Sequence, residues 1–228
     1  MRPLLRAVPL LAILSSACAS ISSYQTAHTV GDGRLQFAIE PAWETSAGDG
    51  GSVSIPRLDF AARYGVSERI DLGGKVGSSG LELTGKFQLT DPANTAFAVS
   101  LAPSAGGLAI GGADETGSAA MGLLNFHLPL LLGIGIGDGG SELVLGARVI
   151  DTLLFLGADG DGGSINIVSV GGTLGFCLSL GRFKLFPEVS IAKPVVGTVD
   201  STGDSSSSKL FGGSLIYQFG LGFLFGGR

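Results

Sequence analysis

The chain has 228 residues, of which 45% are hydrophobic and 14% charged, and its formal net charge is -5. An acidic chain lacks the basic face that nucleic-acid binding requires, so we predict no nucleic-acid partner. Two cysteines are too few for a disulfide framework, and the length suits one all-β domain.

The first residues have the form of a secretory signal peptide. Arg2 and Arg6 supply positive charge, the apolar run from Ala7 to Leu14 follows, and small residues come after it. This run is far shorter than the roughly 18 apolar residues that a membrane-spanning helix needs. We therefore predict that the chain is exported.

Two cleavage sites compete after this run. The stretch LSSAC resembles the lipid-attachment box of bacterial lipoproteins, which implies a signal peptide over residues 1–17 and a palmitate-carrying Cys18. The box usually has leucine at the position of Ser15, so the match departs from the family there. Bacterial lipoproteins that stay at the inner membrane carry aspartate directly after the lipidated cysteine, so Ala19 at that position implies the outer membrane. The alternative is ordinary cleavage after Ala19, because ACA fits the small-x-small rule. Residues 18–32 are small and polar, and we predict a flexible tether there.

Apolar residues alternate with polar ones from about residue 33 to residue 226, as in strands with one apolar face. In RLDFAARYGVSERIDLGGKVG, Leu58 and Phe60 share one face while Arg57 and Asp59 share the other. A proline is poorly tolerated inside a strand, so we predict a β-bulge at Pro129. We predict no helix and about ten strands. The strands are expected at residues 34–44, 57–66, 70–76, 81–89, 97–101, 118–136, 141–156, 170–180, 183–191 and 215–225.

The connections between these runs differ in length. Those at 67–69, 91–94, 138–140 and Gly181 are short, whereas those at 45–53, 104–117, 157–164 and 197–208 are longer and rich in Gly, Ser and Asp. Long loops at one rim and tight turns at the other are typical of an outer-membrane barrel. An even strand number also places both ends of the barrel segment on the turn side.

The direction of the apolar faces decides between two folds. If they point inward, the chain is a soluble sandwich or barrel with a charged surface. We favour the reverse for three reasons: some strands are long, small residues such as Gly171, Gly175, Gly220 and Gly222 occupy the polar faces, and charges on neighbouring strands are opposite in sign. Buried charges must be paired. We therefore predict a lumen charge network made of Arg34, Glu40, Arg57, Asp59, Arg63, Asp71, Lys75, Glu82, Lys86, Arg148 and Glu188.

The stretch ARYGVSERIDLGGKVG, the alternation after it and the aromatic-rich final run resemble small bacterial outer-membrane β-barrel proteins. The resemblance implies an antiparallel up-and-down transmembrane barrel over residues 33–226 in a Gram-negative cell, with outer-membrane lipids and the barrel-insertion machinery as partners. The family usually ends on an aromatic residue. This chain departs from that pattern, because Phe225 lies three residues before its end.

Few residues suggest chemistry. GIGDGG matches a dinucleotide-binding pattern, but a strand follows it where a helix is required. Asp159 and Asp161 have the spacing of a calcium loop without its remaining ligands. His127 has no second ligand near it in sequence and is the only credible general base. We predict no cofactor, metal or catalytic activity.

A barrel of about ten strands is scarcely wider than one that side chains can fill. We therefore predict an outer-membrane protein with a charge-filled lumen, which has a structural or surface role or forms at most a narrow pore for small solutes. The alternative is a soluble, lipid-tethered periplasmic barrel that binds an apolar ligand inside.

Overall fold

The computed structural model describes residues 21–48, 51–78, 80–114, 117–137, 139–158, 161–201, 204–207 and 214–227. Regular structure in these residues is entirely β. None of them forms a helix that is long and apolar enough to cross a membrane. The strands are β1 (Leu35–Gly48), β2 (Gly51–Ser67), β3 (Ile70–Gly77), β4 (Gly80–Gln88), β5 (Phe97–Leu101), β6 (Ser104–Asp114), β7 (Gly117–Ile136), β8 (Ser141–Ala158), β9 (Asp161–Leu180), β10 (Phe183–Ser201), β11 (Asp204–Ser207) and β12 (Leu215–Gly226).

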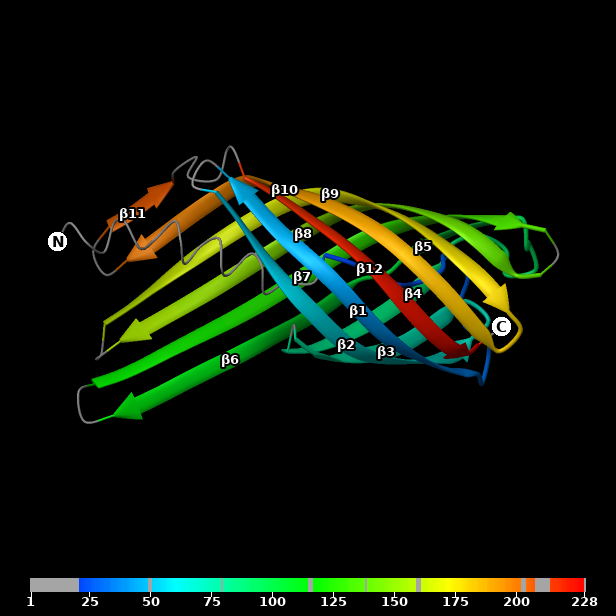
Figure 1. Cartoon of the computed structure of the whole chain (residues 1–228), viewed down its shortest axis with the longest axis horizontal. Helices are drawn as coiled ribbons and strands as arrows, with labels where there is room; N and C mark the ends of the chain where they lie inside the picture. Colours follow the sequence, from blue (N-terminus) through cyan, green and yellow to red (C-terminus); the bar gives the residue numbers. More distant parts are fainter. Residues whose placement is uncertain are drawn as a thin grey trace.

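The strands close into a ring (Figure 1). Sequential strands pair antiparallel from β1 to β4, β5 and β6 together link β4 to β7, and β7 to β10 continue the ladder. Strand β12 pairs with β10 on one side and with β1 on the other, which closes the sheet. Strand β11 pairs only with β10, and β5 and β6 share one place, so the ring has ten places. The predicted antiparallel barrel of about ten strands is confirmed.

The predicted bulge at Pro129 is wrong. Strand β7 pairs with β8 without a register shift, and Pro129 lies opposite Arg148. The irregularity lies in the neighbouring place, where Ala102 and Pro103 separate β5 from β6. The Ala102 N–H donates to the Pro129 carbonyl at 3.0 Å. Because both polar groups of a residue in an antiparallel ladder face the same neighbour, the N–H that Pro129 lacks would also have faced this gap.

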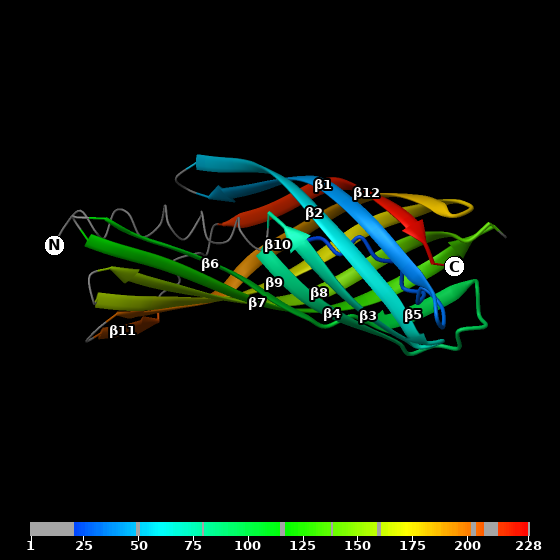
Figure 2. The same cartoon turned by 90° about the horizontal axis from the view of Figure 1, so that it is seen from below.

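The predicted long loops are mostly strand. Strands β1 and β2 run to Gly48 and from Gly51, β6 occupies most of 104–117, and β8 and β10 reach Ala158 and Ser201. The continuing cross-strand ladders override the weak strand propensity of Gly and Ser in these stretches. As a result β6 to β10 extend past the ring (Figures 1 and 2). We call this side the loop end. We call the opposite side, which holds the turns at 68–69 and 181–182 and the end of β12 with Gly227, the turn end.

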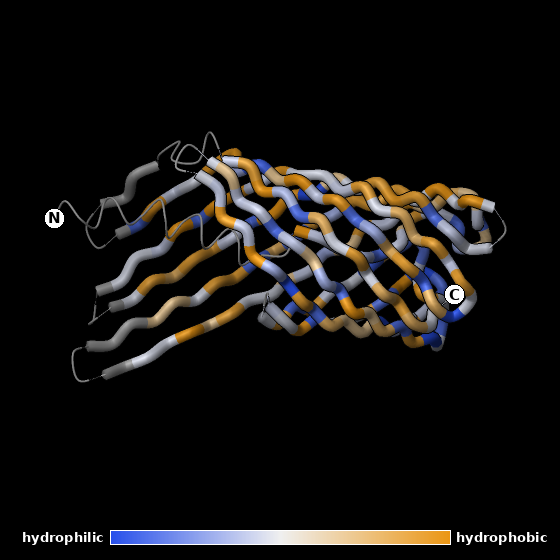
Figure 3. The backbone as a smooth tube through the Cα atoms, viewed as in Figure 1, coloured by the Kyte–Doolittle hydropathy of each residue, from blue (hydrophilic) through white to orange (hydrophobic). Residues whose placement is uncertain are grey.

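The large apolar side chains of the ring are exposed on its outer face. Along the strands, apolar and polar residues alternate (Figure 3). Leu72 is 53% exposed and Phe87 41%, whereas their charged neighbours Asp71 and Lys86 are each 2% exposed. Every strand of the ring contributes at least one large apolar side chain to this outer face. The barrel therefore has an apolar exterior and a polar interior, the reverse of a soluble barrel.

Candidate functional site: the occupied lumen

The lumen is filled by the chain itself. Residues 21–31, which we call the inner segment, precede β1 and are buried except for the half-buried His28. Figures 1 and 2 both show this segment, in dark blue, within the ring of strands. The sequence led us to predict a flexible tether at 18–32, and for residues 21–31 this prediction is wrong. Cys18, the predicted lipidation site, lies outside the described residues.

The wall supplies acceptors for the backbone N–H groups of the inner segment. Glu188 accepts from Ser23 at 2.9 Å and from Tyr24 at 2.8 Å. Glu142 accepts from Ala27 at 2.7 Å. Further bonds run from Ile21 to Gln218 (3.1 Å), from Thr29 to Gln88 (3.1 Å) and from Val30 to Asp71 (3.0 Å). The inner segment belongs to no strand of the ring and thus satisfies these donors with side chains, as a buried backbone must.

Wall side chains also donate to the carbonyl groups of the inner segment. Lys86 donates to the carbonyls of Thr26 (3.3 Å) and His28 (2.7 Å). Arg63 donates to the carbonyl of Ser23 at 3.1 Å. Arg148 and Ser100 donate to the carbonyls of Ile21 and Ala27. The segment is therefore bound by charged groups from several sides of the lumen.

Ion pairs join adjacent strands along the wall. On β1 and β2, Glu44 pairs with Arg57 at 3.3 Å and Glu40 pairs with Arg63 at 3.2 Å. The remaining pairs are Lys75–Glu40 (3.8 Å), Lys75–Glu82 (3.4 Å), Lys86–Asp71 (3.0 Å) and Arg148–Glu188 (4.0 Å). These side chains are buried or nearly so, which makes each partner necessary because an unpaired buried charge is costly.

Ten of the eleven residues predicted for the lumen network face the interior. Nine of these take part in the ion pairs above, and Asp59 is buried beside them at 2% exposure. Arg34 does not belong to the network: it is exposed, it precedes β1, and its guanidinium group lies 3.5 Å from the Gly227 carbonyl. The alternation of β1 would place residue 34 on the inward face, but β1 begins only at Leu35.

Sequence reasoning missed several wall residues. Glu44, Gln88, Glu142 and Gln218 are buried and face the lumen. Each follows the same alternation as its predicted neighbours, so the signal was present in the sequence. The inner segment carried no such signal, because it contains no Asp, Glu, Lys or Arg and its apolar residues show no periodicity.

Glycines make room for the aromatic residues of the interior. A Cβ at Gly220 would overlap the Tyr24 hydroxyl, and a Cβ at Gly222 would lie 3.1 Å from the Tyr24 ring. Tyr24 packs edge-on against Phe186, with ring centroids 6.4 Å apart. Phe186 in turn occupies the space beside Gly175. The small residues of the polar faces therefore accommodate the inner segment and the ring beside it.

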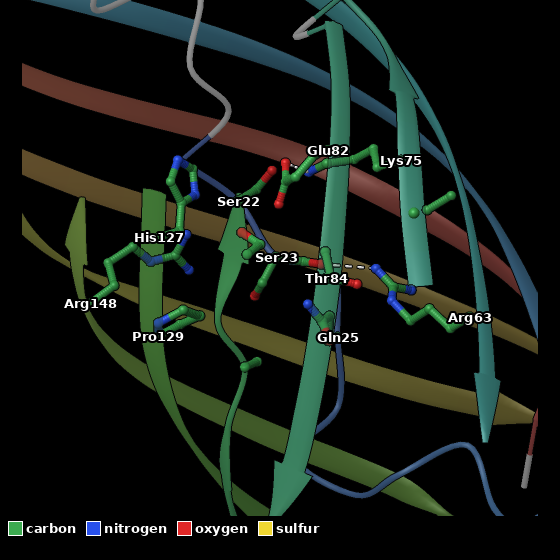
Figure 4. A pocket seen from close by; sticks show the side chains of 14 residues that line it. Ser22, Ser23, Gln25, Arg63, Lys75, Glu82, Thr84, His127, Pro129 and Arg148 are labelled. Atoms are coloured by element: carbon green, nitrogen blue, oxygen red, sulfur yellow. Dashed lines mark hydrogen bonds and ion pairs between the residues drawn. The ribbon is translucent and has the colours of Figure 1, made fainter. Parts of the chain in front are cut away.

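Little free space remains in the middle of the lumen. Figure 4 shows Ser22 and Ser23 between His127 and Arg148 on one side and the Lys75–Glu82 pair on the other. The cavity that these residues border has a volume of about 10 Å³. This is about the space for one water molecule. The lumen is closed at this level.

The charges of the lumen nearly balance. Among the described residues, the interior carboxylates exceed the interior Lys and Arg side chains by one. The carboxylates are Glu40, Glu44, Asp59, Asp71, Glu82, Glu142 and Glu188, and the cations are Arg57, Arg63, Lys75, Lys86, Arg148 and Lys184.

His28 lies where it offsets this excess. Its Nδ1 is 2.8 Å from Glu142, and its Nε2 is 2.9 Å from the Asn94 carbonyl at the turn end. The hydrogen bond to Glu142 raises the pKa of His28, while partial burial and the Lys86 charge act against this rise. A protonated His28 lets both ring nitrogens donate and neutralises the lumen.

The described residues offer little for metal binding or catalysis. No group of three or more His, Cys, Asp or Glu side chains among them is placed to hold a metal ion. His127 is buried against the small cavity, where a substrate has no room. Cys177 is buried and free. The absence of an enzymatic activity remains a prediction.

Comparison with known proteins gives only distant likenesses. No protein-family model matches the chain, and no curated protein matches it. Solved structures with some likeness include Ail of Yersinia pestis (TM-score 0.47, 10% identity, 85% of this chain and 99% of that one). Others are the translocator domain of the autotransporter NalP from Neisseria meningitidis (0.46, 11%, 97% and 94%) and the neisserial surface protein NspA (0.43, 9%, 85% and 99%). At these values the likenesses support no inference about function.

Proposed function

We propose that the chain is an outer-membrane β-barrel protein with a closed lumen and a structural or surface role. The observation that carries this proposal is the continuous apolar exterior, to which all ten places of the ring contribute. Exposed apolar patches on soluble monomers rarely exceed a few hundred Å². A barrel wrapped in apolar side chains with its backbone closed on itself is suited to lipid, where every backbone group must be satisfied internally.

The soluble alternative does not fit the interior. A lipid-tethered periplasmic barrel that binds an apolar ligand needs an apolar cavity, as in lipocalin-like barrels. Here the centre of the lumen holds ion pairs and the inner segment, and the cavity beside Ser22 and Ser23 has about 10 Å³. The same volume argues against an open pore for small solutes in this state.

We include lipidation of Cys18 in this proposal. It is supported by the lipoprotein-like box LSSAC, which ends at Cys18, a few residues ahead of the inner segment. The barrel-insertion machinery is the expected partner during assembly, with β12 as the strand that it would read. Replacement of Cys18 by alanine is expected to abolish incorporation of labelled palmitate. Unchanged labelling would refute lipidation of Cys18.

The membrane proposal is tested by gel migration after detergent extraction. An outer-membrane barrel that stays folded in unboiled sample is expected to migrate differently from the boiled sample. Membrane pellets washed with carbonate should retain the protein. A band that does not shift, together with release by carbonate, would overturn the proposal.

The closed lumen is tested in planar bilayers. Protein whose folding has been verified by the gel shift is expected to give a flat current trace. Stepwise conductance from the full-length chain would favour the narrow pore over a structural or surface role.

A further inference from the structure

The inner segment has a fixed direction inside the barrel. Near its C-terminal side, Val30 bonds to Asp71, the second residue of β3 and close to the turn at 68–69. Ala27 bonds to Glu142, the second residue of β8, which also starts at the turn end. The contacts of the inner segment therefore begin beside the turns.

The contacts move away from the turns as the residue numbers fall. Ser23 and Tyr24 bond to Glu188, the sixth residue of β10. Ile21 accepts from Arg148, the eighth residue of β8. Ile21 also donates to Gln218. The segment thus runs from the turn end toward the loop end when it is followed toward the N-terminus.

Ile21 lies close to the loop-end opening of the ring on the side of β1 and β12. Its partner Gln218 is the fourth residue of β12, which starts at the loop end, and Gln218 lies opposite Glu44, four residues before β1 ends. Three or four strand residues correspond to about 10–13 Å along the strand, and to less along the axis because barrel strands are tilted. Three extended residues of chain cover about 10 Å. Residue 18 is therefore within reach of the loop-end opening.

A return toward the turn end would need a second chain beside the inner segment. The cavity that borders the segment at Ser22, Ser23 and Gln25 has only about 10 Å³. Tyr24 already occupies the space above Gly220 and Gly222. An additional extended chain does not fit into this space.

We propose that the chain ahead of Ile21 leaves the lumen through the loop end. This inference rests on the proposed function in one respect, since the two ends of the barrel lie on opposite sides of a membrane only if the barrel spans it. A lipid on Cys18 would then enter the leaflet on the loop side, and an unlipidated terminus would be displayed beside the hairpins of that side. The lipid would then lie on the side opposite the turn end, although an even strand number places both ends of the barrel segment at the turn end.

The test compares three positions of one epitope tag. The tag is inserted after Ser20, ahead of the inner segment; after Gly48, at the loop-end hairpin of β1 and β2; or after Ala93, in the turn between β4 and β5. Intact cells and cells with a permeabilised outer membrane are labelled with antibody and treated with protease. The tag after Ser20 is expected to behave like the tag after Gly48 and unlike the tag after Ala93.

The outcomes separate the two proposals. A tag after Ser20 that behaves like the tag after Ala93 would overturn the exit through the loop end while leaving the membrane barrel intact. Identical accessibility of all three tags would overturn both, because no membrane would then separate the two ends.

A second variant avoids the inserted tag. In a Cys18→Ala background, Ser20→Cys and Ala93→Cys are each labelled with a membrane-impermeant maleimide in proteoliposomes, and the buried Cys177 supplies the background signal. The two sites are expected to label from opposite sides, and labelling from the same side would contradict the inference. Because wall contacts and not the lipid set the direction, loss of Cys18 should not change the result.

Discussion

Glu188 accepts the N–H groups of two successive residues of the inner segment, and its replacement by glutamine tests how the lumen is closed. The carboxylate accepts the N–H groups of Ser23 and Tyr24 at 2.9 and 2.8 Å, and Arg148 lies 4.0 Å away. Glutamine keeps one acceptor oxygen and turns an NH2 group toward the other backbone N–H. One hydrogen bond to a charged acceptor is lost and the other becomes neutral.

The expected cost follows from these two bonds. A hydrogen bond to a charged group contributes about 1.5–3 kcal/mol and a neutral one about 0.5–1.5 kcal/mol, so Glu188→Gln should weaken docking of the inner segment by about 3 kcal/mol. Local opening then becomes about 100-fold more frequent. Hydrogen–deuterium exchange of the peptide that covers residues 21–31 should accelerate by this factor, while exchange of the β7–β8 ladder stays nearly unchanged.

Glu82→Gln is the matched control. It removes one interior carboxylate whose ion pair is with Lys75 of the wall, whereas Glu188, Glu142 and Asp71 are the carboxylates that accept backbone N–H groups of the inner segment. Exchange of residues 21–31 should therefore remain slow in this variant. Equal acceleration in both variants, or exchange at free-peptide rates in the unaltered protein, would refute the reasoning.

Three further predictions concern the same lumen. The pKa of His28 is raised above 6.5 by its bond to Glu142, so its contribution to docking is complete below about pH 6.5 and is lost as the pH rises through the raised pKa; the protection factors of residues 21–31, which correct for the base-catalysed rise of intrinsic amide exchange, should fall from pH 6 to pH 8.5, and His28→Gln should remove this fall. Glu40→Ala leaves two buried cations without their shared partner and should lower the free energy of unfolding by about 3–5 kcal/mol, measured by urea titration in detergent, whereas an unchanged midpoint would contradict the importance of the pair. Deletion of residues 21–31 should convert a flat bilayer trace into stepwise conductance, and a flat trace from folded deletion protein would show that the wall side chains alone close the lumen.

The barrel could be predicted from the sequence because a strand has a period of two residues. That period places Leu72 on the face opposite to Asp71 and Lys75, and the low charge of one face against the clustered charge of the other indicates which face meets lipid. The Gly- and Ser-rich hairpins could not be assigned correctly, because their strand character comes from pairing with a neighbour and not from their own propensity.

The inner segment could not be predicted for a different physical reason. Its conformation is fixed by bonds to Glu188, Glu142 and Asp71, residues more than 40 positions away along the chain. Nothing in a short stretch without Asp, Glu, Lys or Arg distinguishes a bound segment from a tether. The remaining hint was indirect, since a lumen with so many charges needs polar partners that the wall alone does not supply.

Trp43 gives the most direct test of the apolar exterior. It is the only tryptophan of the chain, lies on β1 and is 54% exposed on the outer face. Protein reconstituted in vesicles whose phospholipids carry bromine on their acyl chains should show strongly quenched Trp43 emission, relative to vesicles without bromine, and little quenching by aqueous iodide. Emission that bromine leaves unchanged and iodide quenches would contradict the lipid-facing exterior.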